Sequence, residues 1–129
     1  MKAQINVVTI GVADLEKSME FYKSFGWKTE GIEFGGVVVF MLENGLALTL
    51  LPRKEVAELA GASDVADGAS KVTLTYSAES ETEVDEVLAK AEAAGGKITK
   101  PATKQDWGGY TGYFTDLDGV TWEAVSGLV

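Results

Sequence analysis

Glu123 is the residue whose type and position could do chemistry in this chain, either as an acid or base or as the partner of a cation. It stands on the second arm of a predicted β-hairpin. The run Trp107 to Val125, WGGYTGYFTDLDGVTWEAV, has strand-like segments on both sides of an Asp-Leu-Asp-Gly turn. Alternation along that arm puts Glu123 on the face opposite Trp122 and Ala124. A glutamate there is most often only solvated, so its meaning depends on its neighbours.

The residue types available for chemistry are few. The chain has 129 residues, no histidine and no cysteine, so the commonest general base, the thiolate nucleophile and the commonest transition-metal ligands are all missing. Carboxylates, lysines and tyrosines remain for proton transfer. The net charge of −9 disfavours binding to phosphate backbones or anionic lipid surfaces and suits both plain solubility and a cationic ligand.

An internal repeat predicts how Glu123 is positioned. The segment Phe34 to Leu50, FGGVVVFMLENGLALTL, follows the same plan as the hairpin around Glu123: an aromatic residue, two glycines, a strand, a turn ending in glycine and a second strand. The turn glycines are Gly45 and Gly119. Four residues beyond each of them lie Thr49 and Glu123, which are therefore equivalent positions.

The first half of the chain is predicted to be strand, helix and three strands. Alternating and apolar patterns predict strands over 4–12 and 27–33, a helix capped by Asp14 and ended by Gly26, and a hairpin with its turn at 43–45. Residues 53–70 are small and polar and are predicted to connect the halves, with one or two helical turns near 55–59.

The second half repeats that order. Lys71 to Tyr76, KVTLTY, can be laid over Val7 to Val12, which aligns Val7 with Lys71 and Thr9 with Thr73. Ser80 and Glu83 predict a capping box for a helix ended by Gly95-Gly96. A strand over 97–100, broken by Pro101, and a loop over 102–106 lead into the hairpin. The predicted fold class is α+β, built from two βαβββ modules at about 4–52 and 71–126.

The sequence resembles the vicinal oxygen chelate superfamily, which includes glyoxalase I, bleomycin resistance proteins, fosfomycin resistance enzymes and extradiol dioxygenases. The resemblance rests on the duplicated plan, on GVADLEKS at 11–18 and Phe-Tyr at 21–22, and on GYFTDLDG at 112–119 followed by Trp-Glu at 122–123. It covers about 4–126. It implies one cup-shaped, curved mixed sheet, but the group hosts many chemistries, so it specifies fold more than function.

The resemblance also implies where a metal would bind. Metal-using members carry His or Glu at one position on the first and on the last strand of each module, which the repeat alignment transfers to Val7, Thr49, Lys71 and Glu123. A catalytic transition metal needs about three imidazole, thiolate or carboxylate ligands, and only Glu123 qualifies. We therefore expect no metal and no other cofactor, and glyoxalase-type metal chemistry is disfavoured.

Two classes of function remain. In the first, the cup binds a small organic molecule, cationic in character, and sequesters a drug or toxic metabolite as bleomycin resistance proteins do. In the second, the protein is a glyoxalase-like lyase or isomerase, or another enzyme of the group, that uses Glu123 or Lys71 as acid or base with help from Tyr113. The expected ligand-binding residues are Val7, Thr9, Thr49, Lys71, Thr73, Trp107, Tyr113 and Glu123.

Further expectations concern partners and the Lys71–Glu123 pair. If both side chains point into a partly dry cup, they should pair, with the ammonium replacing the absent metal. Curved sheets with exposed strand edges predict a homodimer, which light scattering would test. With no signal peptide and no apolar run long enough to span a membrane, the expected location is cytoplasmic, without nucleic-acid or membrane partners.

Overall fold

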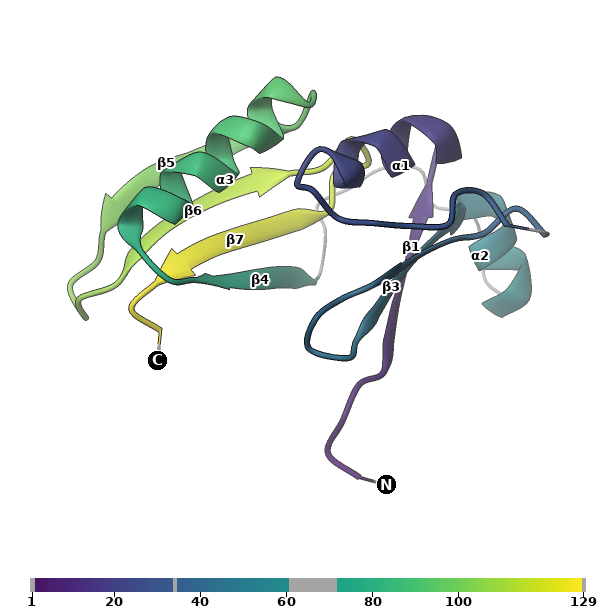
Figure 1. The fold of residues 1–129 in the computed structure, drawn as a ribbon, viewed down its shortest axis with the longest axis horizontal. Helices are drawn as coiled ribbons and strands as arrows, with labels where there is room; N and C mark the ends of the chain where they lie inside the picture. Colours follow the sequence, from purple (N-terminus) through teal and green to yellow (C-terminus); the bar gives the residue numbers. More distant parts are fainter. Residues whose placement is uncertain (1, 34, 61–71, 129) are drawn as a thin grey trace. The chain divides into compact units, whose positions relative to one another are not determined.

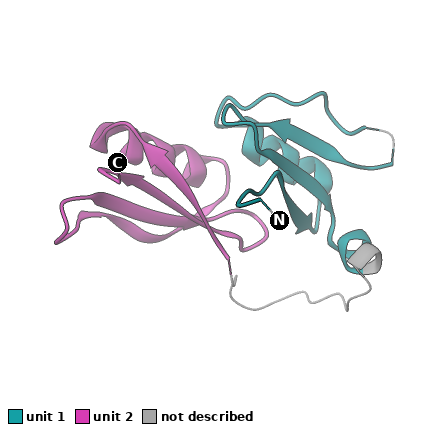
Figure 2. Ribbon diagram, turned by 90° about the horizontal axis from the view of Figure 1, so that it is seen from below, with its two compact units in different colours: residues 1–67 teal, residues 68–129 magenta. Residues whose placement is uncertain are grey.

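The computed structural model describes residues 2–33, 35–60 and 72–128, and of residues 58–60 only the backbone. The chain divides into two compact units, residues 1–67 and 68–129 (Figure 2). Each unit combines one mixed sheet with one or two helices, as Figure 1 shows, so the α+β class is confirmed. None of the helices in the described ranges is long and apolar enough to cross a membrane.

Unit one is a three-stranded sheet with two helices. The sheet has the order β1-β3-β2, with β1 parallel to β3 and β2 antiparallel to it. Its elements are β1 (Val7–Val12), α1 (Leu15–Lys23), β2 (Val38–Met41), β3 (Ala47–Pro52) and α2 (Arg53–Ala60). The helix that was expected near 55–59 is thus present and begins directly after β3.

Unit two is a four-stranded sheet with one helix. Its order is β4-β7-β6-β5, with β4 parallel to β7 and the other pairs antiparallel. The elements are β4 (Thr73–Ala78), α3 (Glu81–Ala93), β5 (Lys97–Lys104), β6 (Tyr110–Thr115) and β7 (Thr121–Ser126). The long helix α3 lies along one face of the sheet (Figure 1).

Local signals fix the helix starts and the hairpin turns. Asp14 caps α1 by accepting from the backbone N–H of Lys17, and Ser80 caps α3 in the same way. Gly45 and Gly119 adopt φ of 88° and 84°, values that glycine tolerates best, at the two predicted hairpin turns. The predicted N-caps and turns are therefore confirmed.

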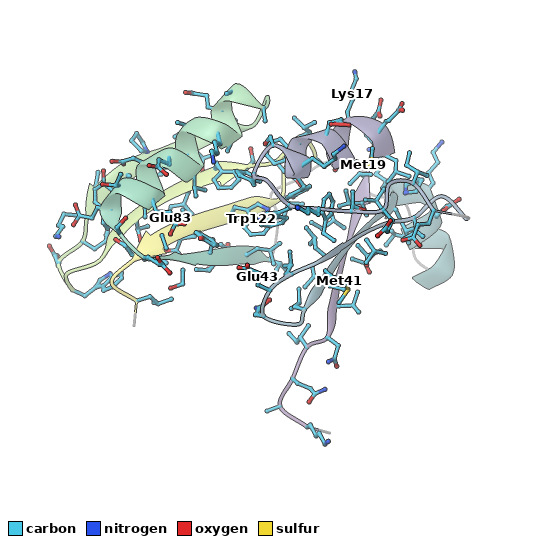
Figure 3. The ribbon with its side chains drawn as sticks, viewed as in Figure 1. Lys17, Met19, Met41, Glu43, Glu83 and Trp122 are labelled. Atoms are coloured by element: carbon cyan, nitrogen blue, oxygen red, sulfur yellow. The ribbon has the colours of Figure 1, made fainter. Side chains whose placement is uncertain are left out.

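Glu83 completes the start of α3 in a slightly different way from the predicted capping box. Its carboxylate accepts from the N–H of Glu79, one residue before the cap, at 2.8 Å and from the hydroxyl of Tyr76 at 2.7 Å. The backbone hydrogen bond, aided by the Tyr76 hydroxyl, lowers the pKa of Glu83. Figure 3 shows Glu83 near the first turn of α3, where this carboxylate links the helix to β4.

Two strand predictions were wrong. Residues 27–33 form only isolated bridges, Thr29 with Phe40 and Glu33 with Val37, because Gly31 turns the chain between them with φ of 93°. In unit two, β5 does not stop at Pro101 but continues to Lys104. Proline is tolerated there because β5 is an edge strand, and register shifts on either side of Lys100 absorb the irregularity.

The repeat alignment of the first strands was also wrong, by two residues. Val7 pairs with Ala47 in β3, and its counterpart is Thr73, which pairs with Thr121 in β7. The offset between the modules is 66 residues for the first strands, β1 and β4, and also for the N-caps, which lie at 14 and 80. Thr9 therefore corresponds to Thr75, not to Thr73, and Val7 corresponds to Thr73, not to Lys71.

Each unit has its own core. In unit one, aromatic rings of α1 and the following turn pack against Phe40 of β2, and Phe21, Tyr22 and Phe40 are almost completely buried. In unit two, Phe114 and Trp122 stack at a centroid distance of 6.2 Å beneath α3. Figure 3 shows Trp122 on β7. These cores fix which face of each sheet remains available for function.

Candidate functional site

A row of side chains crosses the sheet of unit two at the level of Glu123. In the parallel pair of β4 and β7, Thr75 is the register partner of Glu123. In the antiparallel pair of β6 and β7, Tyr113 is its partner. Residues directly opposite each other project from the same face of a sheet, so Thr75, Glu123 and Tyr113 are neighbours in space.

This row lies on the sheet face that points away from α3. The alternate residues of the same strands, Phe114 and Trp122, are buried, and a side chain added at Gly112 would meet Leu88 of α3. The face away from the helix therefore carries the odd-numbered residues of β4, β6 and β7. Most of them have hydroxyl groups: Thr73, Thr75, Ser77, Thr111, Tyr113, Thr115 and Thr121.

Three hydroxyl groups converge on the Glu123 carboxylate. The Thr75 hydroxyl donates to Oε1 at 3.1 Å, the Tyr113 hydroxyl donates to Oε2 at 3.1 Å, and the Thr111 hydroxyl approaches Oε2 at 3.4 Å. An ionised carboxylate can only accept hydrogen bonds, so each hydroxyl must donate its single proton to Glu123. The lone pairs left on these oxygens make the cluster, here called the Glu123 cluster, a set of acceptors.

Tyr113 is held in its protonated form. Its partial burial, followed by the charge of Glu123 and the hydrogen bond to it, raises the pKa of Tyr113 above the ordinary value of 10.0. Near neutral pH the residue is therefore a hydrogen-bond donor and a weak acid. It is not a tyrosinate base.

We expect Glu123→Gln to lower the pKa of Tyr113, because the substitution removes the carboxylate charge and leaves burial as the main cause of the shift. NMR titration of ring-labelled tyrosine would measure this change. Asp85→Asn is the matched control, since Asp85 accepts from the hydroxyl of Tyr110 and raises the pKa of that residue instead. An unchanged Tyr113 titration in Glu123→Gln would contradict the contact.

The same shift predicts a pH dependence of stability. The folded state holds the Tyr113 proton more tightly than the unfolded chain, so the associated stability is present below pH about 10 and is lost as the pH rises through the folded pKa. Tyr113→Phe, which has no such proton, should lose less stability than the wild type above that pH.

Of the other ligand-binding residues that the sequence predicted in unit two, the structure describes Thr73 and Trp107 but not Lys71. Thr73 lies on the same face of β4 as Thr75 and is exposed. Trp107 lies in the turn between β5 and β6 with 57% of its surface exposed. Lys71 lies outside the described residues, and Thr75 is the β4 residue beside Glu123. Sequence reasoning missed Thr75 and Thr111, although the 66-residue offset of the N-caps would have located Thr75.

Unit one has an equivalent row without a charge. Thr49 pairs with Thr9 on one side and with Val39 on the other, and Val7 lies two residues before Thr9 on the same face. The structure thus brings Thr9 and Thr49 together. It gives Thr49 no carboxylate neighbour in this row, so the acceptor cluster belongs to unit two.

The donor set around Glu123 does not fit a catalytic transition metal. The cluster supplies one carboxylate and three neutral hydroxyl groups, whereas such metals take about three imidazole, thiolate or carboxylate ligands. Among the residues whose placement is described, no three His, Cys, Asp or Glu side chains are grouped closely enough to hold a metal ion.

Comparison with known proteins shows the family. The family model described as Glyoxalase/Bleomycin resistance protein/Dioxygenase superfamily matches residues 4–124. A glyoxalase-related enzyme from Fulvimarina pelagi is 30% identical with a TM-score of 0.87, over 97% of this chain and 88% of that one. No sequence among the curated proteins matches significantly.

Two further structures show the same fold at lower identity. A lactoylglutathione lyase from Agrobacterium tumefaciens is 22% identical with a TM-score of 0.72, over 98% of this chain and 96% of that one. A fosfomycin resistance protein from Listeria monocytogenes is 23% identical with a TM-score of 0.75, over 100% and 97%. The match over residues 4–124 is the decisive finding: this chain belongs to the Glyoxalase/Bleomycin resistance protein/Dioxygenase superfamily, the vicinal oxygen chelate group.

Proposed function

We propose that this protein binds a small organic cation at the Glu123 cluster without the help of a metal. The observation that carries the proposal is the direction of the hydrogen bonds. Thr75 and Tyr113 donate to the carboxylate, so what they and Glu123 offer to a ligand is acceptor capacity and a negative charge. An ammonium group, which has only donors, is the complementary partner.

The charge of the whole chain supports a cationic ligand. Twenty acidic residues against eleven basic ones give a negative field that raises the local concentration of cations and speeds their approach. Glu123 is half-buried, so its interaction with a bound cation is screened less than that of a fully exposed carboxylate. We propose that the biological role is to sequester a drug or toxic metabolite, in the manner of bleomycin resistance proteins.

A second candidate is an enzyme of the lyase or isomerase type. The supporting observation is the 3.1 Å hydrogen bond between Tyr113 and Glu123, which joins a weak acid to a carboxylate that could act as a base. In this alternative Glu123 removes a proton from the bound substrate and Tyr113 supplies one. Lys71, the other proposed acid or base, lies outside the described residues.

An NMR titration with butylamine and with butanol tests the binding proposal. We expect butylamine to bind at the Glu123 cluster and Glu123→Gln to weaken that binding roughly tenfold, the loss of about one charge-assisted hydrogen bond. Glu86→Gln, which removes the same charge from an exposed position on α3, is the matched control and should leave binding nearly unchanged.

The outcomes separate the candidates. Equal binding of butylamine and butanol, or no effect of Glu123→Gln, would overturn the cation site. Conversion of an added amine over time, lost in Tyr113→Phe and in Glu123→Gln, would favour the enzyme over the binding protein.

A further inference from the structure

We infer that the ligand is a zwitterion, whose ammonium contacts the Glu123 cluster and whose oxyanion contacts Lys97 and Lys100 on β5. This inference rests on the proposed function and extends it. The row of Thr75, Glu123 and Tyr113 continues onto β5, because Lys100 is the register partner of Tyr113. A cation therefore stands at the far end of the row from Thr75.

Lys97 stands beside Lys100 on the same face. It pairs with Thr115, which lies two residues beyond Tyr113 on β6 and so points to the same side. Both lysines are exposed, and within the described ranges neither ammonium is in an ion pair. The two ammonium groups therefore lie on the same face of the sheet as the Glu123 carboxylate.

The next lysine of β5, Lys104, lies on the other face of the sheet. Lys104 pairs with Tyr110 in the sheet, and its ammonium forms an ion pair with Glu81 of α3. That charge is therefore neutralised by the helix. Lys97 and Lys100 face the opposite side, where α3 supplies no carboxylate, and they remain available to a ligand.

The spacing sets the length of the zwitterion. One strand, β6, lies between β7 and β5, so the backbones that carry Glu123 and Lys100 are about 10 Å apart. The Tyr113 side chain, with its ring, projects from β6 between them. An amine and a carboxylate separated by a short chain of methylene groups can reach both ends, and the methylenes would lie on that ring.

A pair of matched probes tests the inference: ε-aminocaproate and its neutral amide, ε-aminocaproamide, which has the same length and the same amine. Negative net charge favours the amide, which is cationic, over the zwitterion. We nevertheless expect ε-aminocaproate to bind about fivefold more tightly to the wild type, the most that an exposed ion pair typically provides.

Lysine variants show which residues cause the preference for ε-aminocaproate. In the double variant Lys97→Gln with Lys100→Gln, the preference should fall to one or below, while the amide binds at least as tightly as before. Lys104→Gln on the same strand is the matched control and should keep the fivefold preference. Circular dichroism checks that each variant folds.

The result distinguishes this inference from the proposed function. If the amide and ε-aminocaproate bind equally at the Glu123 cluster, the anion subsite is wrong and the cation site stands. If neither probe binds, the proposed function fails with it. An equal loss of preference in Lys104→Gln would mean diffuse attraction by the edge strand, and would also overturn the inference.

Discussion

Phe40→Ala is expected to lower the free energy of unfolding of unit one by about 4 kcal/mol, within the range measured for removing a buried phenylalanine. Phe40 has 0% of its surface exposed. Its ring lies 6.1 Å from that of Tyr22 and 6.2 Å from that of Trp27, centroid to centroid. Removing it would open a cavity among rigid rings that cannot easily collapse into the space.

The neighbour of Phe40 on β2 provides the control. Met41 is 67% exposed and points to the other face, so Met41→Ala should cost within about half a kcal/mol. Denaturant unfolding of both variants, followed by circular dichroism, would measure the two costs. A cost below about 1 kcal/mol for Phe40→Ala would show that the ring is not a core element.

The parts of the fold that the sequence predicted well depend on local chemistry. An Asp or Ser side chain before an amphipathic run caps a helix whatever surrounds it, and Asp14 and Ser80 do so. Glycine at a hairpin turn satisfies a backbone requirement, as Gly45 and Gly119 show. Such signals need no knowledge of the tertiary structure.

The repeat alignment failed because strand patterns are ambiguous. Side chains alternate with a period of two, so sliding Val7 to Val12 by two residues along its counterpart keeps every side chain on the same face. The apolar pattern therefore could not distinguish Lys71 from Thr73 as the partner of Val7. The N-caps could, because they are single positions. The prediction that Pro101 ends the strand failed for a related reason. An edge strand tolerates proline, and the sequence does not show which strand lies at the edge.

Glu123 and one of its three partners, Tyr113, were predicted from the sequence, whereas Thr75 and Thr111 were missed. Alternation on the second arm of the hairpin placed Glu123 on the face away from the core, and the structure agrees. Tyr113 follows from the same hairpin turn, which fixes the register of β6 against β7. Thr75 comes from β4, forty-eight residues earlier in the chain, and only the pairing of strands brings it to the carboxylate.

Gly112→Ala is expected to lower the free energy of unfolding of unit two by about 2 kcal/mol and to disturb the Glu123 cluster. A Cβ at this position would lie 2.5 Å from Cδ1 of Leu88 and 3.1 Å from the backbone of Ala102. Leu88 is buried between α3 and the sheet, so it cannot swing away. The strand itself must move, and it carries Thr111 and Tyr113 on either side of Gly112.

Gly109→Ala is the matched control, because a close contact of the new methyl group does not by itself set the loss of unfolding free energy. A Cβ at Gly109 would meet the ring of Trp107 at closer range than any neighbour of Gly112. Trp107 is exposed, however, and can rotate into solvent, so Gly109→Ala should cost less than about 1 kcal/mol. Denaturant midpoints of the two variants compare a neighbour that is confined with one that is free to move.

The same two variants test whether a shift of β6 disturbs the Glu123 cluster. If β6 shifts in Gly112→Ala, the 3.1 Å hydrogen bond from Tyr113 to Glu123 lengthens, and the pKa of Tyr113 should move down towards its ordinary value. In Gly109→Ala it should stay where it is. Adding Leu88→Val to Gly112→Ala should restore part of both losses, since the shorter side chain makes room for the new methyl group. A stable Gly112→Ala protein with an unchanged Tyr113 titration would mean that contact between α3 and β6 does not hold the site in place.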